Sequence, residues 1–140
     1  MGRAYWVTGA AGAVGGAVIQ MLAERGESVR ALVSPAEAAL PLPVGVEQWV
    51  GELRDRETLK NFLDEGEAGE RVVIHAAMHG TPGERLDTAA YDANAAGTRH
   101  LVDLCERYGV ERLLYIGSVR SLDGTGAPVP SGGWFAESMA

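Results

Sequence analysis

Apolar residues occur along the chain in two different rhythms, which together predict its secondary structure. Short runs rich in Val, Ile and Leu are typical of strands that are buried on both faces of a sheet. Longer stretches with an apolar residue at every third or fourth position predict helices. We expect strands at residues 4–8, 28–33, 47–50, 71–75 and 112–116, helices at 14–25, 56–64 and about 87–108, and a helical turn at 36–40.

The regular alternation of these strands and helices predicts an α/β fold. Strands joined by helices run parallel, and right-handed crossovers then give a doubly wound sheet of order 3-2-1-4-5. We expect one ordered domain over residues 1–124, followed at residues 125–140 by a loop or tail rich in Gly, Pro and Ser. Because a sheet that stops after strand five looks unfinished, we expect a truncated fold, the first half of a longer protein.

A glycine-rich turn, VTGAAGAVGG at residues 7–16, joins the first strand to the first helix. Gly9 can adopt a backbone conformation that a Cβ would penalise, Gly12 lets a pyrophosphate approach the main chain, and Gly15 lets helix and strand pack closely. The first N–H groups of the helix would then face the phosphates. The alternative is a tight strand-to-helix turn without a ligand. The residues predicted to bind the nucleotide here are Gly9, Ala11, Gly12, Ala13, Val14 and Gly15.

Charge and cysteine content narrow the class of protein. The net charge of −7 argues against nucleic acid as a main partner. No apolar run is long enough to cross a bilayer, so we expect no membrane partner. Cys105 is the only cysteine, which excludes an intrachain disulfide and favours a cytoplasmic protein. Its spacing from Leu101 and Tyr108 predicts a core thiol rather than a reactive one.

Four segments carry a more specific pattern. They are TGAAGAVG at residues 8–15, GELRD at 51–55, VIHAA at 73–77 and NAAGT at 94–98. In order and spacing they resemble the TGxxGxxG, GDLxD, VIHLAA and NxxGT motifs of the extended short-chain dehydrogenase/reductase family, also called the NAD-dependent epimerase/dehydratase group. The resemblance covers residues 3 to about 124 and implies a Rossmann-type domain that binds NAD or NADP.

The resemblance also implies cofactor contacts outside the glycine turn. Glu52 would bind the adenine amino group, and Leu53 would contribute its backbone. The alternative for Glu52 is a solvated charge at a strand end. Ala76, Ala77 and Met78, at the end of the fourth strand, would lie beneath the cofactor ribose.

Asn94 and Ser118 are the candidate catalytic residues. By resemblance, Asn94 bonds backbone near the active site and helps to hold a water; the alternative is a surface helix position. Ser118 follows the fifth strand, where the family has its catalytic serine, but a gapless count places Val119 there, and a serine bonded to backbone is an equal alternative. The family also needs a Tyr-x-x-x-Lys, and no tyrosine follows Tyr115. We therefore expect an incomplete catalytic site, and we interpret His75 as a packed strand residue rather than a base.

The residue after the second strand distinguishes NAD from NADP in this fold. An acidic residue accepts a hydrogen bond from the ribose 2′-hydroxyl, whereas an arginine binds a 2′-phosphate. The chain has Ser34 there, followed by Pro35, and we expect no carboxylate at this point to repel a phosphate. Ser34, assisted by Arg30 or Arg54, therefore favours NADP, with NAD as the alternative.

These features predict the NAD(P)-binding portion of an extended short-chain dehydrogenase/reductase. Its substrate would be a sugar nucleotide or another small molecule with a hydroxyl or carbonyl group. One alternative is a non-catalytic NAD(P)-binding regulatory or sensor module, which Val119 favours, and another is an interaction domain without a ligand. A homodimer is expected because the helix with NAAGT has apolar residues for a second face, namely Leu101, Val102, Leu104, Cys105 and Tyr108. The edge beyond the fifth strand would also be left uncovered, which favours pairing between chains.

Overall fold

A computed structural model describes residues 2–64, 69–77 and 88–117, without the side chains of residues 88–91. Strand β1 (Arg3–Thr8) is followed by helix α1 (Ala13–Glu24), β2 (Ser28–Val33), the 3-10 turn η1 (Pro35–Glu37) and β3 (Glu47–Val50). Then come α2 (Arg56–Asp64), β4 (Glu70–His75), α3 (Thr88–Arg107) and β5 (Arg112–Tyr115).

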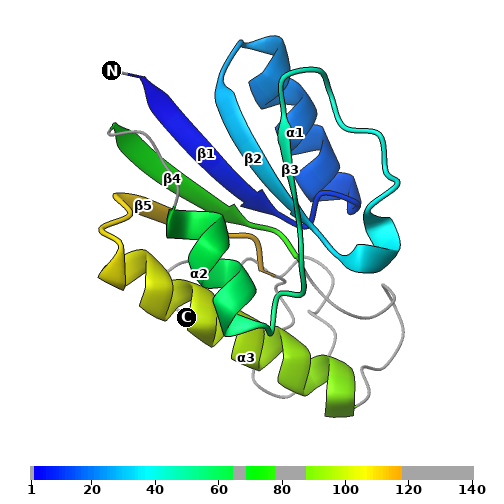
Figure 1. The fold of residues 1–140 in the computed structure, drawn as a ribbon, viewed down its shortest axis with the longest axis vertical. Helices are drawn as coiled ribbons and strands as arrows, with labels where there is room; N and C mark the ends of the chain where they lie inside the picture. The colour runs from blue at the N-terminus through cyan, green and yellow to red at the C-terminus, as the bar shows by residue number, and fades with distance from the viewer. Residues whose placement is uncertain (1, 65–68, 78–87, 118–140) are drawn as a thin grey trace, which may run out of the picture.

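The five strands form one parallel sheet of order β3-β2-β1-β4-β5, with helices on both faces (Figure 1). The predicted fold class and strand order are confirmed. At the centre of the sheet, Thr8 at the end of β1 pairs with Leu32 of β2 and His75 of β4. Because all strands point the same way, their carboxyl ends meet at one edge, and the loops that leave this edge lie close together.

The predicted element bounds are confirmed to within one or two residues, with one larger difference. Residues 36–40 were expected to form a helical turn, whereas η1 covers only Pro35–Glu37. Helix α1 ends in the tight turn that its sequence requires, since Gly26 has φ +71° and its N–H donates to the Ala23 carbonyl. A left-handed residue of this kind closes many helices, and glycine adopts it without strain.

Alternate residues of the three inner strands, β2, β1 and β4, face two separate cores. Trp6, Leu32 and Val73 pack on one face against α2 and α3, where Phe62 and Leu101 are fully buried. The opposite face packs against α1, and its cluster consists of Val7, Ala10, Ile19, Val29, Ala31, Val33, Val72 and Ile74. Burial on both faces explains why the strands read as continuous apolar runs.

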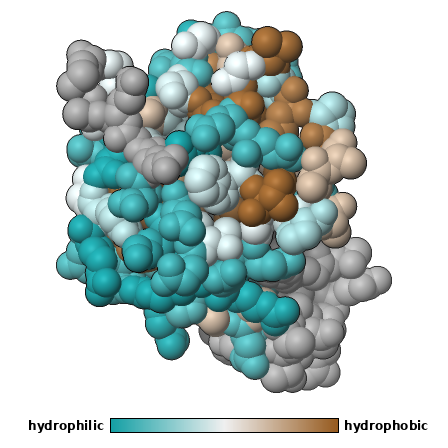
Figure 2. Space-filling view, in the orientation of Figure 1, coloured by the Kyte–Doolittle hydropathy of each residue, from teal (hydrophilic) through white to brown (hydrophobic). Residues whose placement is uncertain are grey.

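Most of the apolar residues that the sequence placed on α3 lie on the side that faces the sheet and α2. Leu101, Leu104 and Cys105 are buried in the cluster with α2, and Tyr108 packs against the same cluster. Val102 is the exposed member of the expected set. The outer surface over α2 and α3 is largely hydrophilic (Figure 2). The expectation of a second apolar face on α3 is therefore wrong, because the stripe is used in covering α2 and the sheet.

Candidate functional site

The loops after β1, β2, β3 and β4 begin side by side at the carboxyl edge of the sheet. The Gly51 N–H donates to the Val33 carbonyl at 2.9 Å, and the Ala76 N–H donates to the Thr8 carbonyl at 3.2 Å. These bonds extend the sheet beyond its last paired residues. Ligands of open α/β sheets bind in the crevice outside such an edge. The glycine turn, Ser34, the GELRD segment and the end of β4 therefore meet where a ligand is expected.

Two glycines of the turn after β1 are required by the fold itself. Gly9 has φ +83°, and a Cβ there would lie 2.6 Å from the Ala76 carbonyl carbon and 2.7 Å from the Ala77 nitrogen. A Cβ at Gly15 would overlap the Gly9 carbonyl oxygen. Gly9 therefore lets the turn lie against the end of β4, and Gly15 lets α1 begin directly against the turn.

Gly12 differs from these two because a Cβ there would be close to only one atom of the protein. A Cβ there would meet one atom within 4 Å, the Gly9 carbonyl oxygen at 3.3 Å. Gly12 is the N-cap of α1, and the first α-helical bond runs from the Gly16 N–H to its carbonyl. The N–H groups of Ala13, Val14 and Gly15 precede that bond, so the helix offers them no acceptor.

This arrangement fits the pyrophosphate of a dinucleotide. The first turn of α1 has no acidic side chain, and its cap makes no side-chain hydrogen bond. The partial positive charge of a 12-residue helix is therefore not neutralised locally, and it favours an anion at this end. A side chain at Gly12 would occupy the space in which the phosphates would lie.

The end of β4 is held against the turn by a buried polar network. The Ala77 N–H donates to Thr8 Oγ1 at 3.2 Å, and Thr8 Oγ1 lies 2.7 Å from His75 Nδ1. On the other side of the ring, His75 Nε2 lies 2.8 Å from Thr98 Oγ1 of α3. Burial lowers the pKa of His75 to about 4, so the ring is neutral at pH 7. The interpretation of His75 as a packed strand residue is confirmed.

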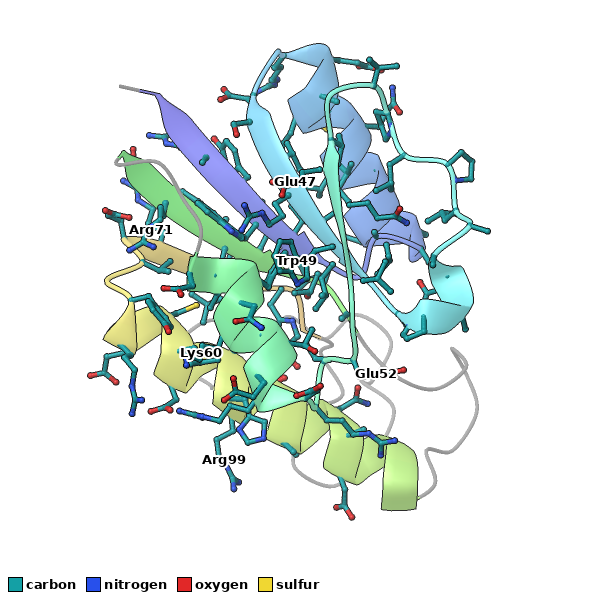
Figure 3. All side chains as sticks on the ribbon, viewed as in Figure 1. Glu47, Trp49, Glu52, Lys60, Arg71 and Arg99 are labelled. Carbon is teal, nitrogen blue, oxygen red and sulfur yellow. The ribbon has the colours of Figure 1, made fainter. Side chains whose placement is uncertain are left out.

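The loop after β3 contacts the NAAGT segment of α3, which also contains Thr98. Leu53 is only 5% exposed, and a Cβ at Gly97 would lie 2.6 Å from its Cγ. Gly97 therefore provides the space in which Leu53 is buried. Glu52, the residue before it, remains partly exposed in the loop between β3 and α2 (Figure 3). The NAAGT segment thus contacts two of the segments predicted to bind the cofactor. Gly97 contacts Leu53 of the loop after β3, and Thr98 contacts His75 at the end of β4.

The acidic residue that ends the GELRD segment has a structural role that sequence reasoning did not assign. Asp55 Oδ1 accepts the Glu57 N–H at 3.0 Å, and Thr58 Oγ1 donates to Asp55 Oδ2 at 3.0 Å. The Thr58 bonds lower the pKa of Asp55. Asp55 therefore caps the first turn of α2 and fixes the direction in which the chain leaves Glu52.

Ser34 lies directly after β2, as predicted, but its surroundings differ from the expectation. Its Oγ donates to Glu37 Oε1 at 2.7 Å, and the Glu37 N–H donates to the Ser34 carbonyl at 2.9 Å. The premise that no carboxylate lies at this point is wrong, because Glu37 is three positions further along the sequence and η1 folds it back. Sequence spacing after a proline at the start of a turn could have suggested this contact.

Arg30 also differs from the expectation, because its side chain forms hydrogen bonds with β3 and α2. Its Nη1 donates to the Phe62 carbonyl at 2.8 Å, and its Nε donates to Glu47 Oε2 at 2.9 Å. The guanidinium lies between the rings of Trp6 and Trp49. It links β2, β3 and α2 and is not the cation that was expected to assist Ser34.

The candidate catalytic residues are only partly placed. Asn94 lies on α3 and is partly buried. Ser118, together with Val119 and Met78, lies outside the described residues. The end of β5 does approach the network, because the Ile116 N–H donates to the His75 carbonyl at 2.9 Å. The residue that precedes the predicted serine by two positions thus lies beside β4.

The parallel sheet, the glycine turn and the open start of α1 define a dinucleotide-binding domain of the Rossmann type. Residues 5–134 match the model of the NAD dependent epimerase/dehydratase family. The chain belongs to this family, and the family resemblance predicted from its motifs is confirmed.

Individual relatives carry different activities. A ketoreductase of Stigmatella aurantiaca is 36% identical over 112 residues, which are 79% of this chain and 32% of the relative. A UDP-glucose 4-epimerase of Streptomyces lividans is 30% identical over 118 residues, 82% of this chain and 36% of the relative. The solved UDP-glucose 4-epimerase of Thermus thermophilus, in complex with NAD, has 26% identity and a TM-score of 0.75, over 99% of this chain and 43% of that one.

The chain spans about a third of the length of the curated relatives that it matches. No helix in the described part of the chain is long and apolar enough to cross a membrane. Within residues 2–64, 69–77 and 88–117, no group of three or more His, Cys, Asp or Glu residues could hold a metal ion.

Proposed function

We propose that this chain is the cofactor-binding part of an NAD(P)-dependent enzyme of the epimerase/dehydratase family. The single observation that carries the proposal is the start of α1 at Gly12, which has no side-chain cap and no acidic residue in its first turn. An anion is the ligand that this arrangement favours, and the neighbouring loops after β2, β3 and β4 suit the rest of a dinucleotide.

The proposed contacts follow from position. The turn formed by Gly9, Ala11, Gly12, Ala13, Val14 and Gly15 would surround the pyrophosphate, and the N–H groups of Ala13, Val14 and Gly15 would donate to it. Glu52 and the Leu53 backbone would bind adenine, while Ala76 and Ala77, with Met78, would lie beneath the ribose. When bound, the nicotinamide would supply the site that accepts or donates a hydride. The residues of this chain would bind and orient it, and Ser34 would lie near the ribose of the adenosine half.

For the whole protein, we propose a small-molecule substrate that carries a hydroxyl or carbonyl group, such as a sugar nucleotide. The presence of both a ketoreductase and a UDP-glucose 4-epimerase among the relatives supports this breadth. Asn94 and Ser118 are the proposed catalytic residues. The 140 residues contain no Tyr-x-x-x-Lys, so we propose no turnover by this chain alone. A cytoplasmic location is proposed because the single thiol, Cys105, is free and buried.

A second candidate function is a non-catalytic NAD(P)-binding regulatory or sensor module. It is favoured by Val119, which takes the position of the catalytic serine when the family pattern is counted without a gap from Asn94. Both candidates require cofactor binding. They differ in turnover, which an assay of the whole protein with a panel of sugar nucleotides and NAD would reveal.

The binding proposal is tested by Gly12→Val, measured by fluorescence titration with NADH and NADPH. The added side chain fills the phosphate space, so we expect affinity to fall by at least about tenfold. Gly2→Val is the matched control, because a Cβ at Gly2 has no neighbour within 4 Å, and it should bind like the wild type. Circular dichroism checks that both variants fold. Equal binding by wild type and Gly12→Val would contradict the proposal, as would a wild type that binds neither nucleotide.

A further inference from the structure

We propose that Glu37 selects NAD over NADP, because it holds a carboxylate at the end of β2 beside Ser34. The inference rests on the proposed function, since it concerns the same dinucleotide site. In doubly wound folds, the group just after the second strand meets the 2′ position of the adenosine ribose. Here that group is a pair of side chains rather than a single residue.

The geometry of η1 fixes the carboxylate in place. Pro35 occupies the first position of the turn and restricts φ, which favours the bend after Ser34. The Glu37 N–H then donates to the Ser34 carbonyl at 2.9 Å, while Glu37 Oε1 accepts from Ser34 Oγ at 2.7 Å. Two hydrogen bonds therefore tie Glu37 to the residue that follows β2, one through its backbone and one through its side chain.

The hydrogen bond from Ser34 Oγ to Glu37 determines whether Ser34 can donate a hydrogen bond to a ligand. A serine hydroxyl has one hydrogen to donate, and in this structure the Glu37 carboxylate accepts it. Ser34 retains lone pairs that can accept, but it has no hydrogen left for a 2′-phosphate, which carries only acceptor oxygens near neutral pH. A ribose 2′-hydroxyl, in contrast, can donate to Ser34 Oγ or to the second carboxylate oxygen of Glu37.

Charge points in the same direction. A 2′-phosphate placed beside Glu37 would bring like charges together in a partly buried site, where repulsion is stronger than in bulk water. Arg30 of β2 does not offset the charge of Glu37, because its guanidinium is bonded to Glu47 and to the Phe62 carbonyl. Hydrogen bonding and charge thus both favour the unphosphorylated ribose of NAD.

The test is Glu37→Gln, titrated with NADH and with NADPH at low and high salt. The amide oxygen of Gln can still accept from Ser34 Oγ, so the substitution removes charge with little change of shape. We expect the wild type to prefer NADH and the NADPH/NADH affinity ratio to rise by at least about tenfold in Glu37→Gln. The rise should be smaller at high salt, because ions screen the repulsion. Glu37→Asp keeps the charge and should keep the preference for NADH.

Glu24→Gln is the matched control, because it removes the same charge from the end of α1 that is remote from the glycine turn. Its Oε1 accepts from Gln20 Nε2 at 2.8 Å, a contact comparable in length to that of Glu37. The affinity ratio should not change in Glu24→Gln. A wild type that prefers NADPH, or a ratio unchanged by Glu37→Gln, would overturn the inference while cofactor binding stands. A wild type that binds neither nucleotide would instead refute the proposed function.

Discussion

His75 illustrates how its partners determine the protonation state of a buried residue. The side chain is 1% exposed, and each ring nitrogen faces a threonine hydroxyl. Thr8 Oγ1 already accepts the Ala77 N–H, so its own hydrogen is available for His75 Nδ1. With Thr8 as the donor to Nδ1, the proton of the neutral ring would lie on Nε2, which would donate to Thr98 Oγ1. This pattern satisfies a neutral imidazole completely, and a second ring proton would disrupt the bond to Thr8.

The buried ring makes stability depend on pH. His75 has a pKa of about 4 in the folded chain and about 6.5 when unfolded. Between these values the unfolded state binds more protons, so the free energy of unfolding decreases as pH falls from about 6.5 to about 4. The loss attributable to His75 should be on the order of 3 kcal/mol at the end of this window. Denaturant unfolding between pH 4 and 7.5 measures it.

Comparison with His75→Gln isolates this contribution, because carboxylates that titrate in the same range remain in both proteins. The variant is less stable at pH 7, but its free energy of unfolding should change less between pH 6.5 and 4 than that of the wild type. His100→Gln, which removes a histidine that is only partly buried on α3, is the matched control for loss of a histidine. An equal slope in wild type and His75→Gln would contradict the buried neutral state.

At the scale of elements, the Arg30 side chain connects β2 with β3 and α2. Its side chain is 11% exposed and lies 5.0 Å from the Trp49 ring centroid and 5.9 Å from that of Trp6. The bond to the Phe62 carbonyl satisfies a backbone acceptor near the end of α2. Figure 3 shows Trp49 and Glu47 along β3, on the edge of the sheet that Arg30 secures.

Replacement of Arg30 should therefore loosen β3 and α2 together. Arg30→Met keeps much of the apolar stem but removes both hydrogen bonds and the stacking on the two tryptophans. We expect the free energy of unfolding to fall by about 1–3 kcal/mol, measured in denaturant. Arg30→Lys should also be destabilising, since an ammonium cannot reproduce the planar contacts. Arg99→Met, at an exposed position of α3, should change stability little; a loss equal to that of Arg30→Met would contradict this role.

Most of the fold could be predicted because each strand carries its own signal. The runs 28–33 and 71–75 read as buried strands from their apolar residues alone, and the order of elements then determines a small set of topologies. The glycine turn was also predictable, since strand, turn and helix are consecutive. Contacts between distant residues were not. Thr98 is 23 positions from His75, and nothing in either segment indicates their bond.

The wrong predictions at the candidate site also arose from contacts that the sequence does not reveal. Ser34 was placed correctly, and the spacing after Pro35 could have suggested that Glu37 comes near it, but the hydrogen bond itself depends on how η1 turns. Arg30 was interpreted as a free cation because its partners, Glu47 and Phe62, come from elements later in the chain. Side-chain chemistry was therefore predictable where the backbone positions it locally, and not where tertiary packing does.

At the scale of the whole molecule, three consecutive exposed apolar residues of the described chain lie at the end of β5, whereas α3 has only Val102 among the large exposed ones. In the described part of the chain, β5 pairs with β4 alone, and its other edge has no partner strand. Leu114 is 50% exposed and Tyr115 is 59% exposed, and Ile116 is also exposed. Unpaired N–H and C=O groups beside apolar side chains favour pairing between chains. Association therefore remains a prediction, at the β5 edge rather than through a second face of α3.

We predict that the 140-residue chain forms a dimer or a larger assembly through the β5 edge, as measured by sedimentation velocity at micromolar concentration. Leu114→Lys should shift the distribution toward monomer, because a lysine at a sheet edge opposes pairing with a second copy. Val102→Lys tests the surface of α3, where Val102 is 47% exposed, and should leave the distribution unchanged. Thermal unfolding of both variants checks that neither loses its fold. A wild-type chain that sediments only as a monomer would contradict the prediction, and a shift caused by Val102→Lys but not by Leu114→Lys would move the interface back to α3.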